Sequence, residues 1–224
     1  FVGAYDKTDI ILYIAKIISL TGKKVLVIDS TINQKAKYVV PVINPTKSYI
    51  TEFEGMDIAV GFNNLQQIQE YLGTEDKKID YDIVLIDSTE AINIYGMKEA
   101  NKNYFVTSFD LYSLKRGIEI LDGLNETVKL KKVLFSKYAS SEEDDYLNFL
   151  SLGHKIVWES ERIYFPFELG DQSVIIENQI ISKIKVKRLS NQFRESLLYM
   201  AEEIVAPEDK GKVKKAFKQL EKEV

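Results

Sequence analysis

The sequence predicts a doubly wound α/β fold, with a mainly parallel sheet of about seven strands and helices on both faces. Three observations lead to this prediction. Short apolar runs recur along the chain, as in strands that are buried on both faces. Amphipathic helical patterns lie between these runs, and such alternation requires crossover connections between parallel strands. With 224 residues, 45% of them hydrophobic, the chain is long enough for one compact core.

Four segments have the pattern of a buried strand. They are residues 24–29 (KVLVID), 81–87 (YDIVLID), 104–108 (YFVTS) and 132–136 (KVLFS). The first two end on an aspartate, Asp29 and Asp87. Because α/β folds bind their ligands at the carboxyl ends of strands, we expect both carboxylates to lie near a functional site.

Helical patterns fill most of the sequence between these strands. In residues 8–20 the apolar side chains recur at helical spacing, and Gly22 follows as a helix-ending residue. Further helices are predicted over residues 64–72, 89–97, 111–124, 189–205 and 207–224. Residues 32–60 contain only short extended pieces and turns. We expect one α/β domain over residues 1–206 and a C-terminal amphipathic helix over residues 207–224.

Composition excludes several classes of chemistry. The chain has no cysteine and one histidine, which rules out disulfides, thiolate metal sites, iron–sulfur clusters and a histidine metal cluster. A net charge of −4 argues against a protein that coats nucleic acid with its whole surface. No apolar run approaches the roughly 20 residues of a membrane-spanning helix. We therefore expect a cytoplasmic protein.

The first nine residues, FVGAYDKTD, have the order of a phosphate-binding loop, in which a strand end leads through a short loop into a helix. In such loops the backbone N–H groups and the helix dipole bind phosphate, a lysine neutralises it, and a hydroxyl holds Mg²⁺. Lys7 and Thr8 occupy the places of that lysine and that hydroxyl. Asp87, at a strand end, suits the magnesium shell.

Together these segments resemble the ParA/MinD family of deviant Walker A P-loop ATPases, including its CpaE/TadZ-like branch, which localises pili and secretion machinery. The resemblance covers loop 3–8, the strand at 23–29 (KKVLVID), the strand at 81–87 followed by Ser88 and Thr89, and residues 104–121 (YFVTSFDLYSLKRGIEIL). It implies ATP and Mg²⁺ as cofactors. By position, Thr8 and Asp87 would hold Mg²⁺ and Asp29 would sense the γ-phosphate. The residues implied at the phosphates are Gly3, Ala4, Asp6 and Lys7.

Three positions depart from the family pattern. Val2 stands where the family has a lysine that reaches the nucleotide of a partner subunit. Asp6 stands where the family has a glycine, and its carboxylate would repel a polyphosphate. Thr31 stands where the family has an acid that helps to position the attacking water. All three changes oppose hydrolysis, so we expect a degenerate site that works by binding, with slow or no turnover.

The function that follows is a ParA/MinD-like positioning or assembly protein, acting as a nucleotide-binding switch or a pseudo-ATPase scaffold. Its partner would be a protein of a localisation, secretion or partition assembly, and nucleotide occupancy would set its homodimer state. One alternative is an active ATPase that partitions DNA through non-specific binding. The other is a ligand-free interaction scaffold, in which Lys7 pairs with Asp29 or Asp87.

Two surface features offer further contacts. A basic cluster near the penultimate helix would suit DNA phosphates or a partner, or is simply a solvated face. Its members are Lys183, Lys185, Lys187, Arg188 and Arg194. The C-terminal helix carries a narrow apolar stripe among lysines, which suits peripheral contact with the inner face of a membrane or docking on a partner or on its own domain. The stripe consists of Val213, Phe217, Leu220 and Val224.

Overall fold

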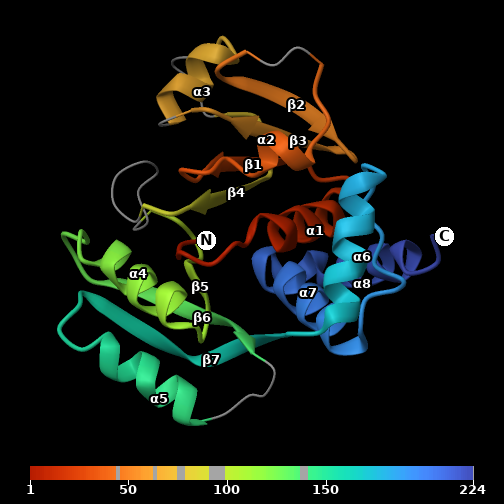
Figure 1. Cartoon of the computed structure of the whole chain (residues 1–224). Coiled ribbons are helices and arrows are strands. Elements are labelled where there is room, and N and C mark those ends of the chain that lie inside the picture. The colour runs from red at the N-terminus through yellow and green to blue at the C-terminus, as the bar shows by residue number, and fades with distance from the viewer. Residues whose placement is uncertain (44–45, 63–64, 75–78, 91–98, 137–140, 224) are drawn as a thin grey trace. The chain divides into compact units, whose positions relative to one another are not determined.

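A computed structural model describes residues 1–43, 46–62, 65–74, 79–90, 99–136 and 141–223 of the chain (Figure 1). The chain divides into two compact units. Unit 1 comprises Phe1–Lys7 and Ser88–Phe167, and unit 2 comprises Thr8–Asp87 and Glu168–Val224. Each unit has its own sheet and its own helices, so each is described by itself.

The sheet of unit 2 has four strands in the order β2-β3-β1-β4. They are β1 (Val25–Ser30), β2 (Tyr49–Phe53), β3 (Met56–Val60) and β4 (Ile83–Ser88). β1 and β3 are parallel, whereas β2 and β3 form an antiparallel hairpin that turns at Glu54 and Gly55. β1 and β4 confirm the strands predicted at 24–29 and 81–87, and the hairpin lies in the region where the sequence shows only extended pieces and turns.

Helix α1 (Thr8–Ser19) is the central helix of unit 2, where it contacts β1, α7 and α8. Nearly all its side chains are buried, because apolar residues occupy almost every position. At its start, the Asp9 carboxylate accepts a hydrogen bond from Gln179 at 2.7 Å and pairs with Lys35. The other helices of unit 2 are α2 (Ala36–Val39), α3 (Leu65–Tyr71), α6 (Leu169–Ile180), α7 (Asn191–Ile204), the 3₁₀ turn η1 (Pro207–Asp209) and α8 (Lys210–Leu220).

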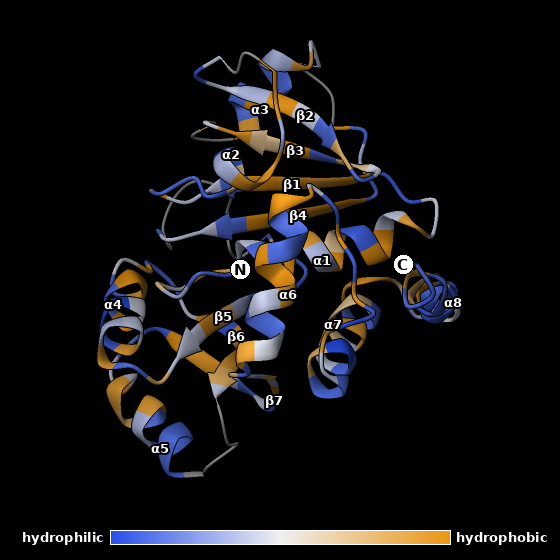
Figure 2. Ribbon diagram, turned by 45° about the vertical axis from the view of Figure 1, so that its right-hand side comes forward, coloured by the Kyte–Doolittle hydropathy of each residue, from blue (hydrophilic) through white to orange (hydrophobic). Residues whose placement is uncertain are grey.

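The apolar stripe of the C-terminal helix is buried within unit 2. Val213, Phe217 and Leu220 are buried, and α8 packs on α1 and α7. Lys23 holds Asp209 at the start of α8 at 2.8 Å, and Arg194 holds Glu221 at its end at 2.8 Å. Figure 2 shows α8 as largely hydrophilic in colour, since lysines flank the apolar stripe. Of the predicted roles of this stripe, docking on its own domain is the one that Val213, Phe217 and Leu220 serve. Val224 lies outside the described residues.

Unit 1 has a three-stranded parallel sheet in the order β5-β6-β7. Its strands are β5 (Tyr104–Ser108), β6 (Val128–Ser136) and β7 (Ile156–Pro166), and its helices are α4 (Leu111–Leu121) and α5 (Ser141–Leu150). Asp110 caps α4 by accepting a hydrogen bond from the Ser113 N–H. At the N-terminus, Val2 forms parallel bridges with Ser88 and Phe105.

The predicted fold class is confirmed: a mixed four-stranded sheet and a parallel three-stranded sheet carry helices in a doubly wound α/β arrangement. The strands predicted at 104–108 and 132–136 are β5 and the second half of β6. The helix predicted over 89–97 lies mostly outside the described residues. A single domain over residues 1–206 stays a prediction.

Candidate functional site

Within unit 2, a hydroxyl and a carboxylate meet where α1 begins. The Thr8 Oγ1 donates a hydrogen bond to Asp87 Oδ2 at 3.0 Å, and the two side chains are only 3% and 1% exposed. The helix supplies Thr8 at its first residue, and β4 supplies Asp87 near its carboxyl end. Both oxygens are hard donors of the kind that Mg²⁺ prefers. The predicted pair of magnesium-binding residues is therefore brought together.

Asp87 is fixed to the neighbouring strand through its backbone. The Ser30 hydroxyl, at the end of β1, donates a hydrogen bond to the Asp87 carbonyl at 2.8 Å. The carboxylates of Asp29 and Asp87 thus project from adjacent strands of one sheet. This is the carboxyl edge at which α/β proteins bind ligands.

Asp29 is engaged by the loop that follows its own strand. One carboxylate oxygen accepts hydrogen bonds from the Thr31 N–H at 3.0 Å and the Thr31 hydroxyl at 2.6 Å. The other accepts one from the Ala36 N–H at 2.8 Å. The predicted sensor of the γ-phosphate therefore anchors loop 31–36 at the start of α2. Thr31 takes part in the same loop by donating two hydrogen bonds to Asp29.

Burial raises the pKa of the Asp29 carboxyl above its ordinary value, and the negative charge of Asp87 adds to this effect. The hydrogen bonds from Thr31 and Ala36 act in the opposite direction, because they favour the ionised form. With two buried acids on neighbouring strands, it is therefore unfavourable for both carboxyl groups to be ionised at this edge of the sheet. A cation bound there would favour their ionisation.

The predicted phosphate loop lies in unit 1, where Gly3 sets its path. Gly3 has φ +141°, and a Cβ added to it would lie 2.1 Å from the carbonyl oxygen of Val106. The Lys7 ammonium, which is buried, donates a hydrogen bond to the Gly3 carbonyl at 3.0 Å. Ala4 is partly buried, and Asp6 is exposed. The loop therefore folds around its own lysine.

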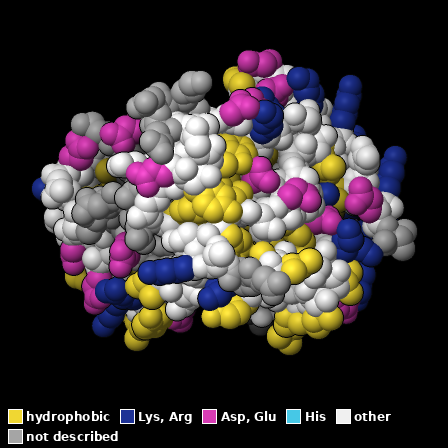
Figure 3. Space-filling view, turned by 90° about the horizontal axis from the view of Figure 1, so that it is seen from above, with side chains coloured by type: hydrophobic (Ala, Val, Ile, Leu, Met, Phe, Trp, Pro, Cys, Tyr) yellow, Lys and Arg dark blue, Asp and Glu magenta, His cyan; other side chains and the backbone are white. Residues whose placement is uncertain are grey.

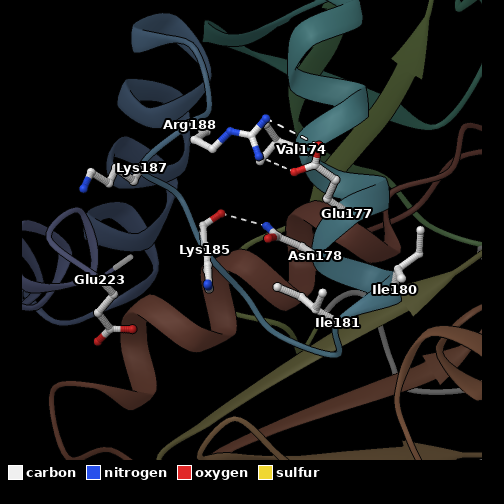
Figure 4. A pocket seen from close by; sticks show the side chains of 9 residues that line it. All are labelled: Val174, Glu177, Asn178, Ile180, Ile181, Lys185, Lys187, Arg188 and Glu223. Carbon is white, nitrogen blue, oxygen red and sulfur yellow. Dashed lines mark hydrogen bonds and ion pairs between the residues drawn. The ribbon is translucent and has the colours of Figure 1, made fainter.

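The predicted basic cluster is partly neutralised within unit 2. Its members lie between α6 and α7 and on α7, and three of the five pair with acids, namely Lys183 with Glu54, Arg188 with Glu177 and Arg194 with Glu221. Figure 4 shows the Arg188 guanidinium directed at Glu177. Lys185 and Lys187 line a cavity of about 470 Å³ beside α6.

Pairing with acids reduces the charge that Lys183, Arg188 and Arg194 can offer to DNA phosphates. In Figure 3, basic and acidic side chains both occur on the face that is drawn. The DNA-partitioning alternative stays a prediction.

The described residues contain no group of three or more His, Cys, Asp or Glu side chains that could hold a metal ion. None of their helices combines the length and apolar character needed to cross a membrane. A magnesium ion at Thr8 and Asp87 would therefore complete its shell with oxygens from water or from a nucleotide.

No protein-family model matches the chain, and no curated protein does. Solved structures do match. A ParA family ATPase from Chlorobium tepidum has 13% identity and a TM-score of 0.54, over 86% of this chain and 92% of that one. A plasmid partition protein from Borrelia burgdorferi, bound to AMPPNP, has 10% identity and a TM-score of 0.50, over 88% of this chain and 93% of that one.

A further match is MinD in a MinC:MinD cell division complex from Aquifex aeolicus, with 14% identity and a TM-score of 0.49, over 97% of this chain and 91% of that one. At these identities, the first two likenesses show the fold. The chain therefore has the fold of ParA-type ATPases, as its sequence predicts.

Proposed function

We propose that the chain is a ParA/MinD-like positioning or assembly protein that binds ATP with Mg²⁺ as a switch and turns it over slowly or not at all. The observation that carries this proposal is the buried hydrogen bond between Thr8 and Asp87 at the first turn of α1. A hydroxyl at a helix start beside a strand-end carboxylate is the arrangement that P-loop proteins use for the magnesium of a bound nucleotide.

The residues present fit Mg²⁺ and a polyphosphate in part. Thr8 and Asp87 offer oxygen ligands, and Lys7, one residue earlier in the chain, offers a cation for phosphate oxygens. When bound, Mg²⁺ would neutralise phosphate charge and orient the oxygens. Gly3 and Ala4 would contribute backbone N–H groups to the same phosphates.

The same residues support weak turnover. Asp6 brings a negative charge to the loop that would hold the phosphates, and Thr31 has no carboxylate with which to orient a water molecule. Asp29 would have to release hydrogen bonds to Thr31 and Ala36 before it could contact a ligand. Binding would therefore be the functional event, and it would govern homodimer formation and contact with a protein partner of a localisation, secretion or partition assembly.

A second candidate function is a ligand-free interaction scaffold. It is favoured by the hydrogen bonds that Lys7 and Asp29 make to their own loops, because each uses atoms that a nucleotide would need. Melting temperatures measured with ATP, ADP and GTP, each with and without Mg²⁺, separate the two candidates. A ligand at 100 times its Kd adds about 2.7 kcal/mol to the free energy of unfolding, which is readily measured. The switch predicts such a shift with Mg²⁺ and ATP, and the scaffold predicts none with any nucleotide.

Replacing Asp6 by glycine is expected to strengthen ATP binding. An exposed carboxylate beside a polyphosphate costs about 1 kcal/mol of binding free energy, so Asp6→Gly should lower the Kd about fivefold. Isothermal titration calorimetry measures this change. Asp6→Asn is the matched control for charge alone and should recover part of the gain. An unchanged Kd in both variants would show that the acid at this position does not weaken the site.

A further inference from the structure

Tyr49, at the first position of β2, carries a buried hydroxyl that the sequence analysis did not single out. The side chain is only 5% exposed, and its hydroxyl has no hydrogen-bond partner among the described residues. A buried hydroxyl without a partner destabilises a folded protein, because it loses its hydrogen bonds to water. The packing of β2 therefore does not explain why residue 49 carries a hydroxyl.

The register of the sheet places Tyr49 in line with the acids of the candidate site. Tyr49 pairs with Val60 across β2 and β3, and Val60 pairs with Asp29 across β3 and β1. Residues paired in this way project from the same face of a sheet. With strands about 4.8 Å apart, the Cα atoms of Tyr49 and Asp29 are about 10 Å apart. Tyr49 therefore faces the same edge as Asp29, two strands away.

The phenol stays protonated in this position. Burial raises the pKa of the Tyr49 phenol above its ordinary value, and the Asp29 carboxylate raises it further. A protonated hydroxyl can donate a hydrogen bond to an anionic oxygen or to a metal-bound water. Along this edge of unit 2, Asp29 lies two strands from Tyr49, and Asp87, which accepts the Thr8 hydrogen bond, lies three strands away.

We propose that the Tyr49 hydroxyl is a positioning contact for the bound ligand, donating a hydrogen bond to a phosphate oxygen or to a water of the Mg²⁺ shell. This inference rests on the proposed function and adds to it a residue from the β2–β3 hairpin. It predicts that the hydroxyl contributes to ligand affinity while contributing nothing to the stability of the unliganded protein.

The test compares Tyr49→Phe with Tyr81→Phe in the full chain. Each variant removes one hydroxyl, but the Tyr81 hydroxyl has an internal partner, since it donates to Asp57 Oδ2 at 2.8 Å. Calorimetry gives the Kd for ATP with Mg²⁺ and for ATP in EDTA, and thermal unfolding gives the unliganded melting temperature. For Tyr49→Phe we expect a Kd about threefold to tenfold higher and an unchanged or higher melting temperature. For Tyr81→Phe we expect an unchanged Kd and a lower melting temperature.

Comparing ATP with Mg²⁺ and ATP in EDTA identifies the group that accepts the hydrogen bond from the Tyr49 hydroxyl. Weaker binding of Tyr49→Phe both with Mg²⁺ and in EDTA indicates a phosphate oxygen, and weaker binding with Mg²⁺ alone indicates a water of the metal shell. The inference is overturned, with the proposed function intact, if the natural protein binds ATP and Tyr49→Phe binds it equally well. It is also overturned if Tyr49→Phe melts lower without ligand. If the natural protein binds no ATP under either condition, this inference and the proposed function fail together.

Discussion

Replacing Gly3 by alanine is expected to lower the free energy of unfolding by about 3 kcal/mol. The added Cβ would lie 2.1 Å from the Val106 carbonyl oxygen, and Gly3 has φ +141°, a backbone conformation that strains any other residue. The contact cannot be relieved by a side-chain rotation, because the opposing atom belongs to the backbone of β5. The neighbouring bond from the Val106 N–H to the Val2 carbonyl, at 2.8 Å, holds the two segments together.

Urea unfolding of Gly3→Ala against the natural protein measures this loss. Gly211→Ala is the matched control, because Gly211 lies in α8 with no atom within 4 Å of an added Cβ. That control should raise the free energy of unfolding by up to about 1 kcal/mol, since alanine is the better helix former. A loss below about 1 kcal/mol for Gly3→Ala would show that the loop adapts and that its path does not depend on glycine.

Replacing Asp29 by alanine is expected to lower the free energy of unfolding by about 3 kcal/mol. The carboxylate accepts three hydrogen bonds from Thr31 and Ala36, and Asp29 is buried, so the variant leaves buried donors without an acceptor. Thr31→Val removes only the hydroxyl donor and should cost about 1 kcal/mol. Urea unfolding of both variants provides the comparison.

The loss in Asp29→Ala should also depend on pH. The folded-state pKa of Asp29 is raised. The contribution of Asp29 to the free energy of unfolding is therefore greatest at a pH below its ordinary pKa of 3.8, and it declines as the pH rises through the folded-state pKa. The difference between the natural protein and Asp29→Ala should therefore narrow from acid to neutral pH. A difference that widens instead would indicate that the ionised form is the one that the fold stabilises.

Much of the fold could be predicted from local patterns. The apolar runs identify β1, β4 and β5. β1 and β5 are almost wholly buried, as strands covered on both faces are, whereas most residues of β4 are only partly buried. The helix at residues 8–20 is predicted by apolar side chains that recur at helical spacing. Thr8 and Asp87 also meet within unit 2, at a helix start and a strand end, as their places in the sequence suggest. Their role as one magnesium site stays a prediction.

What the sequence could not show depends on partners distant in the chain. The charges of Lys183 and Arg194 look available in the sequence, yet Glu54 and Glu221 neutralise them. An amphipathic stripe predicts that α8 buries one face, but not that the face packs on α1 and α7. The Tyr49 hydroxyl belongs to a hairpin with no sequence motif, and only the strand register places Tyr49 in line with Asp29, two strands away.

The central claim is that Thr8 and Asp87 form the magnesium site of a bound nucleotide, and the Mg²⁺ dependence of ATP affinity tests it most directly. Calorimetry with and without Mg²⁺ should be carried out on the natural protein, on Thr8→Val and on Thr8→Ser, which keeps the hydroxyl. Mg²⁺ should tighten ATP binding about tenfold or more in the natural protein and in Thr8→Ser, but not in Thr8→Val. ATP binding with the same Mg²⁺ dependence in all three proteins, or no binding in any of them, would contradict the claim.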